Sequence, residues 1–600
     1  MGGFTDEDWA SVSTELPTTE DAVIKQYLKG RESLIAEEHK KRSDYAFRQG
    51  LSPIARKACA IVDRIRADER RRIWTPKLEE KIATGEGGPD AGRDDGAGMT
   101  LYPGQVFTHA KGLIEQTALW KIVRKLPKGS LLHAHCDAIV NFEFVFNVLL
   151  ETPGLHIVGT SGPLATPAQL AERVVTFPYR KVAHHVVTEA ESKASGGTKK
   201  ANPAPWDPSY VAGTPVLLTE AADAFPDGGR KGFVAWLKTR CTISQLDAIE
   251  QHHGLDHIWE KFHKCFMMMG AMIHYEPVWR AFLRQLMRQM FDDGLSWVEV
   301  RIKWPCDYHR EGSEEPEPDY LHLFGVAEEE VEKFRKETNN AFWGLRFIWT
   351  ELRSFGARAI TENMDYCITT KLAYPQMIAG YDVVGQEDLG RPLKDLLPEL
   401  FWFRKQCAEE GVNIPFFFHA GECLGDGDDT DNNVFDAILL GTRRIGHGFS
   451  LYKHPLLIDL VKDKRILIES CPISNEILRL CGSILSHPLP ALLARGVPCG
   501  LNNDDPAILG QDLEGVSHDF WQALQGWENL GLAGLGSLAE NSVRWSAFED
   551  ETNEEWTQHI REASLGNSIK AQRLKEWSVQ WEKFCLWVVT EYGEQYGDDE

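Results

Sequence analysis

The chain has 600 residues, of which 43% are hydrophobic and 26% charged, as in a globular protein with a large core rather than a fibrous or wholly disordered one. Its 65 Lys and Arg against 89 Asp and Glu leave a formal net charge of −24, which argues against non-specific binding to nucleic acid. No apolar run approaches the roughly 18 residues that span a bilayer, so we expect no membrane partner.

The first residues and the cysteines favour a cytoplasmic location. Residues 1–23 are acidic and lack the basic and apolar regions of a secretory signal peptide. The 12 cysteines are scattered along the chain, without the closely spaced pairs that bind structural zinc. Buried and reduced thiols are the simplest interpretation, because disulfides are rare in reducing compartments. We therefore expect an intracellular protein.

The N-terminal segment is predicted to be helical. In residues 18–83 apolar residues recur at intervals of three and four, and charged residues fill the positions between them. A Gly- and Asp-rich stretch at 85–98 predicts a flexible loop after these helices. We therefore expect a helical N-terminal extension over residues 1–100, followed by the main body over residues 101–510.

Eight short apolar runs follow in the main body. From the second run onward, each is separated from the next by a segment that contains a plausible helix. Apolar runs that alternate with helices are typical of parallel strands covered on both faces. Eight such units predict an α/β protein with a (β/α)8 barrel, the TIM barrel, rather than an open sheet. The runs are residues 131–136, 297–304, 345–353, 377–385, 414–422, 443–448, 465–474 and 497–505.

The gap between the first and second predicted strands is too long for a single crossover helix. It is rich in Pro and Gly and contains a low-complexity tract at 191–205, so we expect a subdomain inserted at about 151–260. After the last predicted strand, residues 511–600 read as helices, which we expect to pack on the barrel.

Ionisable side chains follow directly after the apolar cores of several predicted strands. The active sites of barrel enzymes lie at the carboxyl ends of the strands, so these side chains are expected to meet. Charged groups placed there are costly unless they are paired or bind a metal. They are His133 and His135 after the first strand, His419 and Glu422 after the fifth, His447 after the sixth, and Asp504 and Asp505 after the eighth.

Three histidines and one aspartate form a ligand set that suits a borderline divalent ion, most often Zn²⁺. His133 and His135 are two residues apart on a strand, so both side chains point to the same face. A catalytic zinc ion lowers the pKa of its bound water to about 7. Glu422 follows His419 by three residues, which places a carboxylate beside the metal as a general acid. The sequence therefore predicts hydrolytic chemistry.

Six motifs, taken in order, resemble the adenosine deaminase family. They are HAHCDA, VVGQED, FHAGE, RIGHG, CPISN and NNDDP, and the resemblance extends from about residue 104 to 510. The long insertion and the helical N-terminal extension are similar to the growth-factor-type branch of that family. Members of that branch are typically secreted, with a disulfide in the insertion, whereas this chain has no cysteine between Cys136 and Cys241. Extracellular signalling is therefore not expected.

This resemblance implies the hydrolytic deamination of adenosine, and of 2′-deoxyadenosine, to inosine and ammonia with one Zn²⁺ per chain. Hydroxide would attack C6 of the purine while Glu422 protonates N1, and His447 would orient the attacking water and help to deprotonate it. A homodimer formed through the N-terminal helices is also implied. The zinc ligands would be His133, His135, His419 and Asp504. The catalytic residues would be Glu422, His447 and Asp504. Asp137 would bind the 5′ hydroxyl of the ribose, the backbone of Gly385 would contact N3 of the purine, and Asp505 would bind N7.

Three alternatives stay open from the sequence. An AMP deaminase could use the same site, although the carboxylate of Asp137 accepts a hydrogen bond from a 5′ hydroxyl and repels a 5′ phosphate. A binding or signalling protein that has lost catalysis would be expected to have a broken ligand set, yet the four ligands and Glu422 are all present. Another amidohydrolase, acting on a different amine or amide, would leave the purine-facing Gly385, Glu422 and Asp505 without a role.

Overall fold

Two sequence predictions, the loop at 85–98 and most of the tract at 191–205, lie outside the described residues. The part of the chain that the computed structural model describes contains no helix long and apolar enough to cross a membrane. The described residues are 3–74, 107–181, 202–244, 247–248, 254–304 and 307–597.

Eight parallel strands form a closed barrel, as predicted. Strands β1, β5, β6 and β7 pair in one sheet, and β8, β9, β10 and β11 pair in a second. Parallel bridges between Tyr381 and Phe416 and between Ala134 and Asp504 join the two sheets at both edges, so the ring closes. Each strand overlaps one predicted apolar run. The strands are β1 (Gly129–Leu131), β5 (Leu295–Ile302), β6 (Gly344–Leu352), β7 (Ile378–Val384), β8 (His419–Ala420), β9 (Arg444–His447), β10 (Leu467–Ser470) and β11 (Cys499–Leu501).

Helices surround the barrel because a parallel strand pair needs a crossover connection that returns the chain to the same end of the sheet. Each crossover helix presents an apolar face to the strands; in α15, Trp279, Phe282, Leu283 and Leu286 are buried at helical spacing. The helices are α15 (Glu276–Asp292), α16 (Leu321–Glu337), α17 (Ala357–Ala373), α18 (Leu397–Glu410), α19 (Asn433–Leu439), α20 (Pro455–Asp463), α21 (Pro472–Ile477) and α22 (Leu489–Ala494).

One end of the barrel is closed by the C-terminal part of the chain. Trp545 donates its indole N–H to the carbonyl of Arg465, just before β10 begins. Trp545 and Trp556 pack in one buried cluster with apolar side chains of β6, β7 and β10 and with Leu132 and Phe417, which lie beside β1 and β8. The C-terminal helices are α23 (Gly515–Gly526), α24 (Gly531–Arg544), α25 (Asn553–Glu562) and α26 (Ile569–Tyr596), and α24 contacts both β1 and β11.

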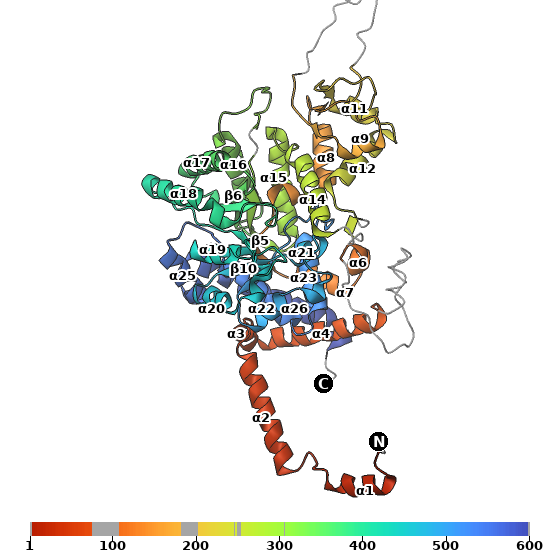
Figure 1. Ribbon diagram of the computed structural model, residues 1–600, viewed down its shortest axis with the longest axis vertical. Helices are drawn as coiled ribbons and strands as arrows, with labels where there is room; N and C mark the ends of the chain where they lie inside the picture. The colour runs from red at the N-terminus through yellow and green to blue at the C-terminus, as the bar shows by residue number, and fades with distance from the viewer. Residues whose placement is uncertain are drawn as a thin grey trace, which may run out of the picture.

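The segment between β1 and β5 holds a small antiparallel sheet of β2 (His156–Gly159), β3 (Val175–Thr176) and β4 (Val216–Leu217). Trp236 packs there as a core residue, with its indole N–H donated to the carbonyl of Leu170 at 3.0 Å. The helices of this segment are α8 (Phe142–Glu151), α9 (Pro167–Glu172), α11 (Leu218–Asp223), α12 (Gly229–Cys241) and α14 (Gly254–Gly270). Figure 1 shows α8, α9, α11 and α12 as a lobe beside α14 and α15, at the upper right of the molecule.

The N-terminal extension is helical but interrupted. Proline fits the first turn of a helix, and Ser52 caps the helix that starts at Pro53 by accepting from Ala55 N at 3.0 Å. The helices are α1 (Asp6–Glu15), α2 (Ala22–His39), α3 (Tyr45–Gln49) and α4 (Pro53–Arg72). Helices α1 and α2 have no buried residue, whereas α4 packs on α26. Figure 1 shows α2 leading away from the barrel, with α1 at its far end. Separate domains over 1–100, 101–510 and 511–600 stay a prediction.

Candidate metal centre and active site

The four side chains predicted to bind a metal meet at the carboxyl ends of β1, β8 and β11. Their ligand atoms all lie within 4.8 Å of one another. The Nε2 atoms of His133 and His135 lie 3.2 and 3.3 Å from one oxygen, Oδ1 of Asp504. His133 Nε2 and Asp504 Oδ1 are buried and have no hydrogen-bond partner among the described residues. Because unpaired buried polar atoms are costly, their convergence fits a divalent metal ion.

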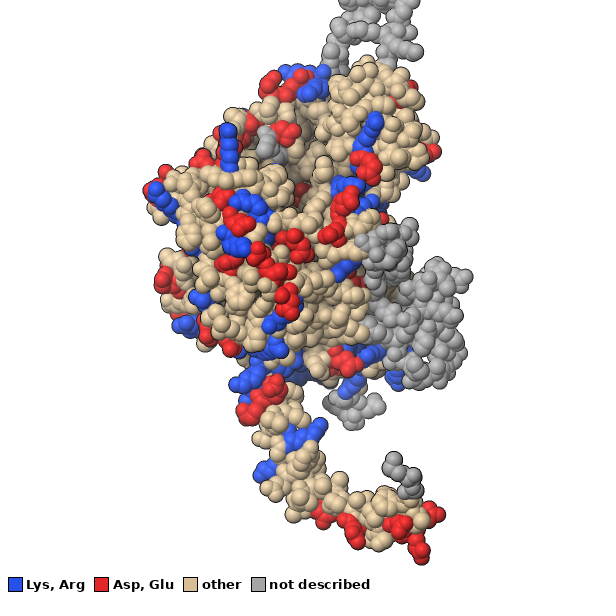
Figure 2. Space-filling model, viewed as in Figure 1, with Lys and Arg blue, Asp and Glu red and all other residues tan. Residues whose placement is uncertain are grey.

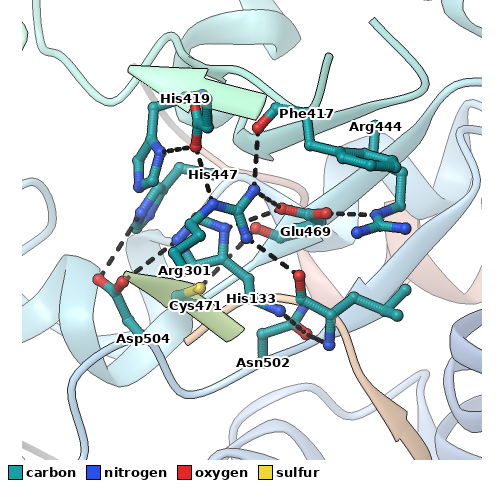
Figure 3. Close-up of polar contacts among 12 residues, drawn as sticks. His133, Arg301, Phe417, His419, Arg444, His447, Glu469, Cys471, Asn502 and Asp504 are labelled. Atoms are coloured by element: carbon teal, nitrogen blue, oxygen red, sulfur yellow. Dashed lines mark hydrogen bonds and ion pairs between the residues drawn. The ribbon is translucent and has the colours of Figure 1, made fainter. Parts of the chain in front are cut away.

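Two buried carboxylates orient two of these imidazoles (Figure 3). Glu469 Oε2 lies 2.8 Å from His133 Nδ1, and Asp382 Oδ2 lies 2.6 Å from His419 Nδ1. Burial raises the pKa of each carboxyl, but the Arg301 cation and the neighbouring histidine lower it by more, so both pKa values lie well below their ordinary range. Each carboxylate therefore keeps the imidazole proton on Nδ1 and leaves Nε2 to face the metal position.

The main chain is strained at two site residues. His447 and Asp504 have φ values of +60° and +57°, which L-residues rarely adopt. Hydrogen bonds hold Asp504 in this conformation, since its carbonyl accepts from the N–H of His135 at 2.9 Å and its carboxylate accepts from Ser474 Oγ at 2.7 Å. The backbone thus turns the Asp504 carboxylate toward the histidines.

Glu422 lies beside the metal ligands without belonging to the set. It is buried, and its Oε1 lies 3.5 Å from His447 Nδ1. Burial, with the carboxylates of Asp504 and Glu387, raises the pKa of Glu422 well above its ordinary value. A carboxyl that keeps its proton near pH 7 can act as a general acid. The surroundings of Glu422 therefore favour its protonated form, which is the form that this role requires.

Glu387, which the sequence analysis did not single out, holds the main chain at Glu422. Its two carboxylate oxygens accept from the N–H groups of Gly421 at 3.2 Å and Glu422 at 2.8 Å, and Asn433 Nδ2 donates to it at 2.7 Å. Gly421 has a φ of +78°, and a Cβ there would lie 2.7 Å from a methyl group of Val434. The loop after β7 therefore fixes the position of Glu422.

A chain of hydrogen bonds fixes the tautomer of His447. The main-chain N–H of Leu489 donates to His487 Nδ1 at 3.1 Å, so neutral His487 carries its proton on Nε2, which lies 3.0 Å from Asn475 Oδ1. The Asn475 amide then donates to His447 Nδ1 at 3.0 Å. Burial lowers the pKa of His487 to about 3 and that of His447 well below 6.5, so both are neutral at pH 7. His447 therefore carries its proton on Nε2, which lies 3.6 Å from Asp504 Oδ2.

The predicted substrate residues lie around the same end of the barrel. Both carboxylate oxygens of Asp505 are buried, and no described residue hydrogen-bonds to them. Burial and the carboxylates of Asp504 and Asp137 raise the pKa of Asp505, so it can donate a hydrogen bond. Gly385 has a φ of +99°, and the absence of a side chain there lets a ligand approach the main chain. Asp505 and the main chain at Gly385 can thus bind a purine, whose ring nitrogens are hydrogen-bond acceptors.

The structure brings the four predicted metal ligands together and places His447 and Glu422 beside them, and it adds other residues. Gly385 directly follows β7, and the roles predicted for Asp137, Gly385 and Asp505 stay predictions. The sequence analysis did not single out Arg301, Asp382 and Glu469, although each is a charged residue inside an apolar strand run. That interruption is the signal that could have found them, because strand residues buried on both faces are normally apolar.

Comparison with known proteins shows the family to which this chain belongs. A family model described as adenosine deaminase matches residues 241–563. The chain is 30% identical to adenosine deaminase 2 of Sus scrofa over 475 residues, which cover 77% of this chain and 85% of that protein. It is 29% identical to adenosine deaminase 2 of Homo sapiens over 504 residues, covering 82% and 85%, and 29% identical to adenosine deaminase 2-A of Danio rerio over 469 residues, covering 76% and 82%. This chain belongs to the adenosine deaminase family, in its growth-factor-type branch.

Proposed function

We propose that this chain is a zinc-dependent enzyme that hydrolyses adenosine, and 2′-deoxyadenosine, to inosine and ammonia. The observation that carries the proposal is the convergence of three histidines and one aspartate beside the buried carboxyl group of Glu422. Three nitrogen ligands and one carboxylate form a set typical of Zn²⁺, and one ion per chain would fill it. Membership of the adenosine deaminase family supports the choice of substrate.

The residues of the site divide the work of this reaction. Zinc, when bound, supplies a water whose pKa is near 7 and which can therefore serve as hydroxide. Glu422 donates its proton to N1 of the purine, which makes C6 electrophilic. His447 donates from Nε2 and so orients the nucleophile; of its two predicted roles we retain this one, because a protonated Nε2 cannot take a proton. Addition of hydroxide at C6 and loss of ammonia give inosine, while Asp505 binds N7 and Gly385 lies at N3.

Asp137 favours a nucleoside over a nucleotide as substrate. A cation at the 5′ end would be needed to neutralise a phosphate, and two nearby basic side chains are already paired. Lys303 lies 3.7 Å from Glu351, and His274 lies 2.6 Å from Asp307. A 5′ phosphate would therefore meet the carboxylate of Asp137, whereas a 5′ hydroxyl can donate to it. Figure 2 shows Asp and Glu side chains, interspersed with Lys and Arg, below the hollow in this face of the molecule.

The ultraviolet change from adenine to hypoxanthine tests this assignment. We expect the zinc-loaded chain to convert adenosine and to leave AMP almost unchanged. Asp137→Asn should lower kcat/KM for adenosine roughly 10-fold or more, because a hydrogen bond to a charged group is lost. The same substitution should also reduce the preference of the enzyme for adenosine over AMP. Faster turnover of AMP than of adenosine by the unmodified chain would contradict the role of Asp137, and turnover of neither would favour a binding protein.

We also propose a homodimer formed through the arm, defined as α1 and α2 with the residues that flank them. The arm has no buried residue in either helix, and it exposes large apolar side chains: Phe4 is 69% exposed, Tyr27 70% and Leu34 73%. Exposed apolar side chains gathered on one projecting element mark a surface that binds a partner. The resemblance to the growth-factor-type branch supports a second copy of this chain as that partner.

Charged substitutions in the arm test the dimer. Trp9→Glu combined with Tyr27→Glu should convert the dimer to a monomer in light scattering, because a charge in an apolar interface is left without a partner. Both side chains are exposed, so the unfolding temperature of the barrel should stay the same. Leu565→Glu, at a residue that is 93% exposed outside the arm, is the control and should leave the dimer intact. A monomeric unmodified chain would refute the proposal.

A cytoplasmic location is likewise proposed. The described cysteines are free thiols, and all of them except the half-buried Cys59 are buried. Burial raises the pKa of several of these thiols, that of Cys59 to about 12, which keeps them protonated and unreactive. Such thiols suit a reducing compartment.

A further inference from the structure

The guanidinium of Arg301 lies behind the metal centre and is fully buried (Figure 3). Its Nε donates to Asp382 Oδ2 at 2.8 Å, and its Nη2 donates to Glu469 Oε2 at 2.7 Å. These are the same two oxygens that face the Nδ1 atoms of His419 and His133. One side chain therefore fixes both carboxylates that orient imidazole ligands.

Arg301 also holds the main chain on which the histidine ligands stand. Nη1 donates to the carbonyl of Leu132, and Nη2 donates to the carbonyl of Phe417, both at 3.0 Å. Leu132 precedes the first histidine ligand, and Phe417 lies two residues before the third. The main-chain N–H of Arg301 donates to the carbonyl of Ala134, which stands between the first and second, at 2.8 Å. Arg301 is thus bonded to both of the segments that carry the three histidine ligands.

Charge makes this arrangement depend on Arg301. Glu469 has a second cation, since Arg444 Nε lies 2.5 Å from its other oxygen. Among the ion pairs of the described residues, Arg301 is the one arginine or lysine that lies within 4 Å of Asp382. All four side chains are 0% exposed, so water does not screen the interaction between them. Without Arg301 the two carboxylates would be free to move apart.

We propose that Arg301 is a positioning residue that sets the zinc affinity of this site. It fixes the directions of two imidazole ligands by holding their carboxylate partners and the strands that carry them. The inference rests on the zinc site proposed above. A planar guanidinium presents its donors in a rigid fork, whereas a lysine offers a single flexible ammonium that cannot replace four divergent hydrogen bonds. The expected effect is on metal binding.

Arg301→Lys tests the proposal without changing the charge. We expect it to weaken zinc binding roughly 10- to 100-fold, measured with zinc alone in competition with a chromophoric chelator. Arg346→Lys is the matched control. Arg346 is as deeply buried, and its guanidinium bonds to Ala547, Ile378 and Asp550, away from the centre. It should lower the unfolding temperature yet keep the zinc affinity. Unchanged affinity in Arg301→Lys, or an equal loss in both variants, would overturn the proposal.

Glu469→Gln tests the same contacts if Arg301→Lys does not fold. It keeps the size of the side chain but weakens the bonds to both Arg301 and His133, so zinc binding should fall about 10-fold or more; unchanged binding would count against the proposal. The zinc site itself has a separate readout, because the unmodified chain should bind one zinc ion and His419→Ala should bind it far more weakly. No zinc binding by the unmodified chain would refute the proposed function. Zinc binding that Arg301→Lys leaves unchanged would refute only the role of Arg301.

Discussion

Glu422→Gln should lower kcat for adenosine by about 10³-fold, the size of effect expected when a general acid is removed. The amide keeps the shape of the side chain but cannot give a proton to N1 of the purine. KM should change little, because the contacts at N3, N7 and the ribose remain. Steady-state kinetics at pH 7, with the zinc content measured on the same sample, check this result.

Two controls make the Glu422 result specific. Zinc content should stay at one ion per chain, since Glu422 is not among the ligands. Glu69→Gln changes another buried carboxyl whose pKa burial raises to about 7, and Glu69 lies on α4, where it accepts from the N–H groups of Ala118 and Leu119. It should leave kcat unchanged. Substantial activity in zinc-loaded Glu422→Gln would mean that another group protonates N1.

Removal of zinc with a chelator should abolish deamination and destabilise the chain. A ligand that binds only the folded state, present at 1,000 times its Kd, contributes about 4 kcal/mol to the free energy of unfolding. The destabilisation has a local cause: without the ion, the Oδ1 atom of Asp504 and the Nε2 atom of His133 remain buried without hydrogen-bond partners among the described residues. Urea unfolding with and without zinc measures the difference, and added zinc should restore both activity and stability.

His419→Ala separates the metal from a general effect of the chelator. Added zinc should not stabilise this variant appreciably, because it has lost one of the four ligands and the bond to Asp382. Full activity in a chain shown to be free of metal would contradict the proposed chemistry. Equal stabilisation of the unmodified chain and the variant would place the zinc elsewhere.

The sequence by itself determined the barrel strands and the residues of the site. Eight apolar runs could be recognised because parallel strands covered on both faces are apolar along their length. His133, His419 and Asp504 stood out because polar groups at the carboxyl ends of such strands lie on one rim of a barrel. The inference that these residues meet needs only the order of strands and helices along the chain, and it requires no knowledge of tertiary contacts. The prediction of helix over 18–83 did not locate the break between α2 and α3 at residues 40–44.

Only the tertiary structure decided how the site is supported. Arg301 reaches Asp382 across 81 residues of sequence and Glu469 across 168, and the bond from Asn475 to His447 spans 28. Local patterns carry no information about such pairs, because closure of the barrel and the inward turn of alternate side chains bring them together. The positions of the imidazoles and the tautomer of His447 follow from those contacts. The physical reason is that a buried charge or amide must find its partner wherever the fold places one.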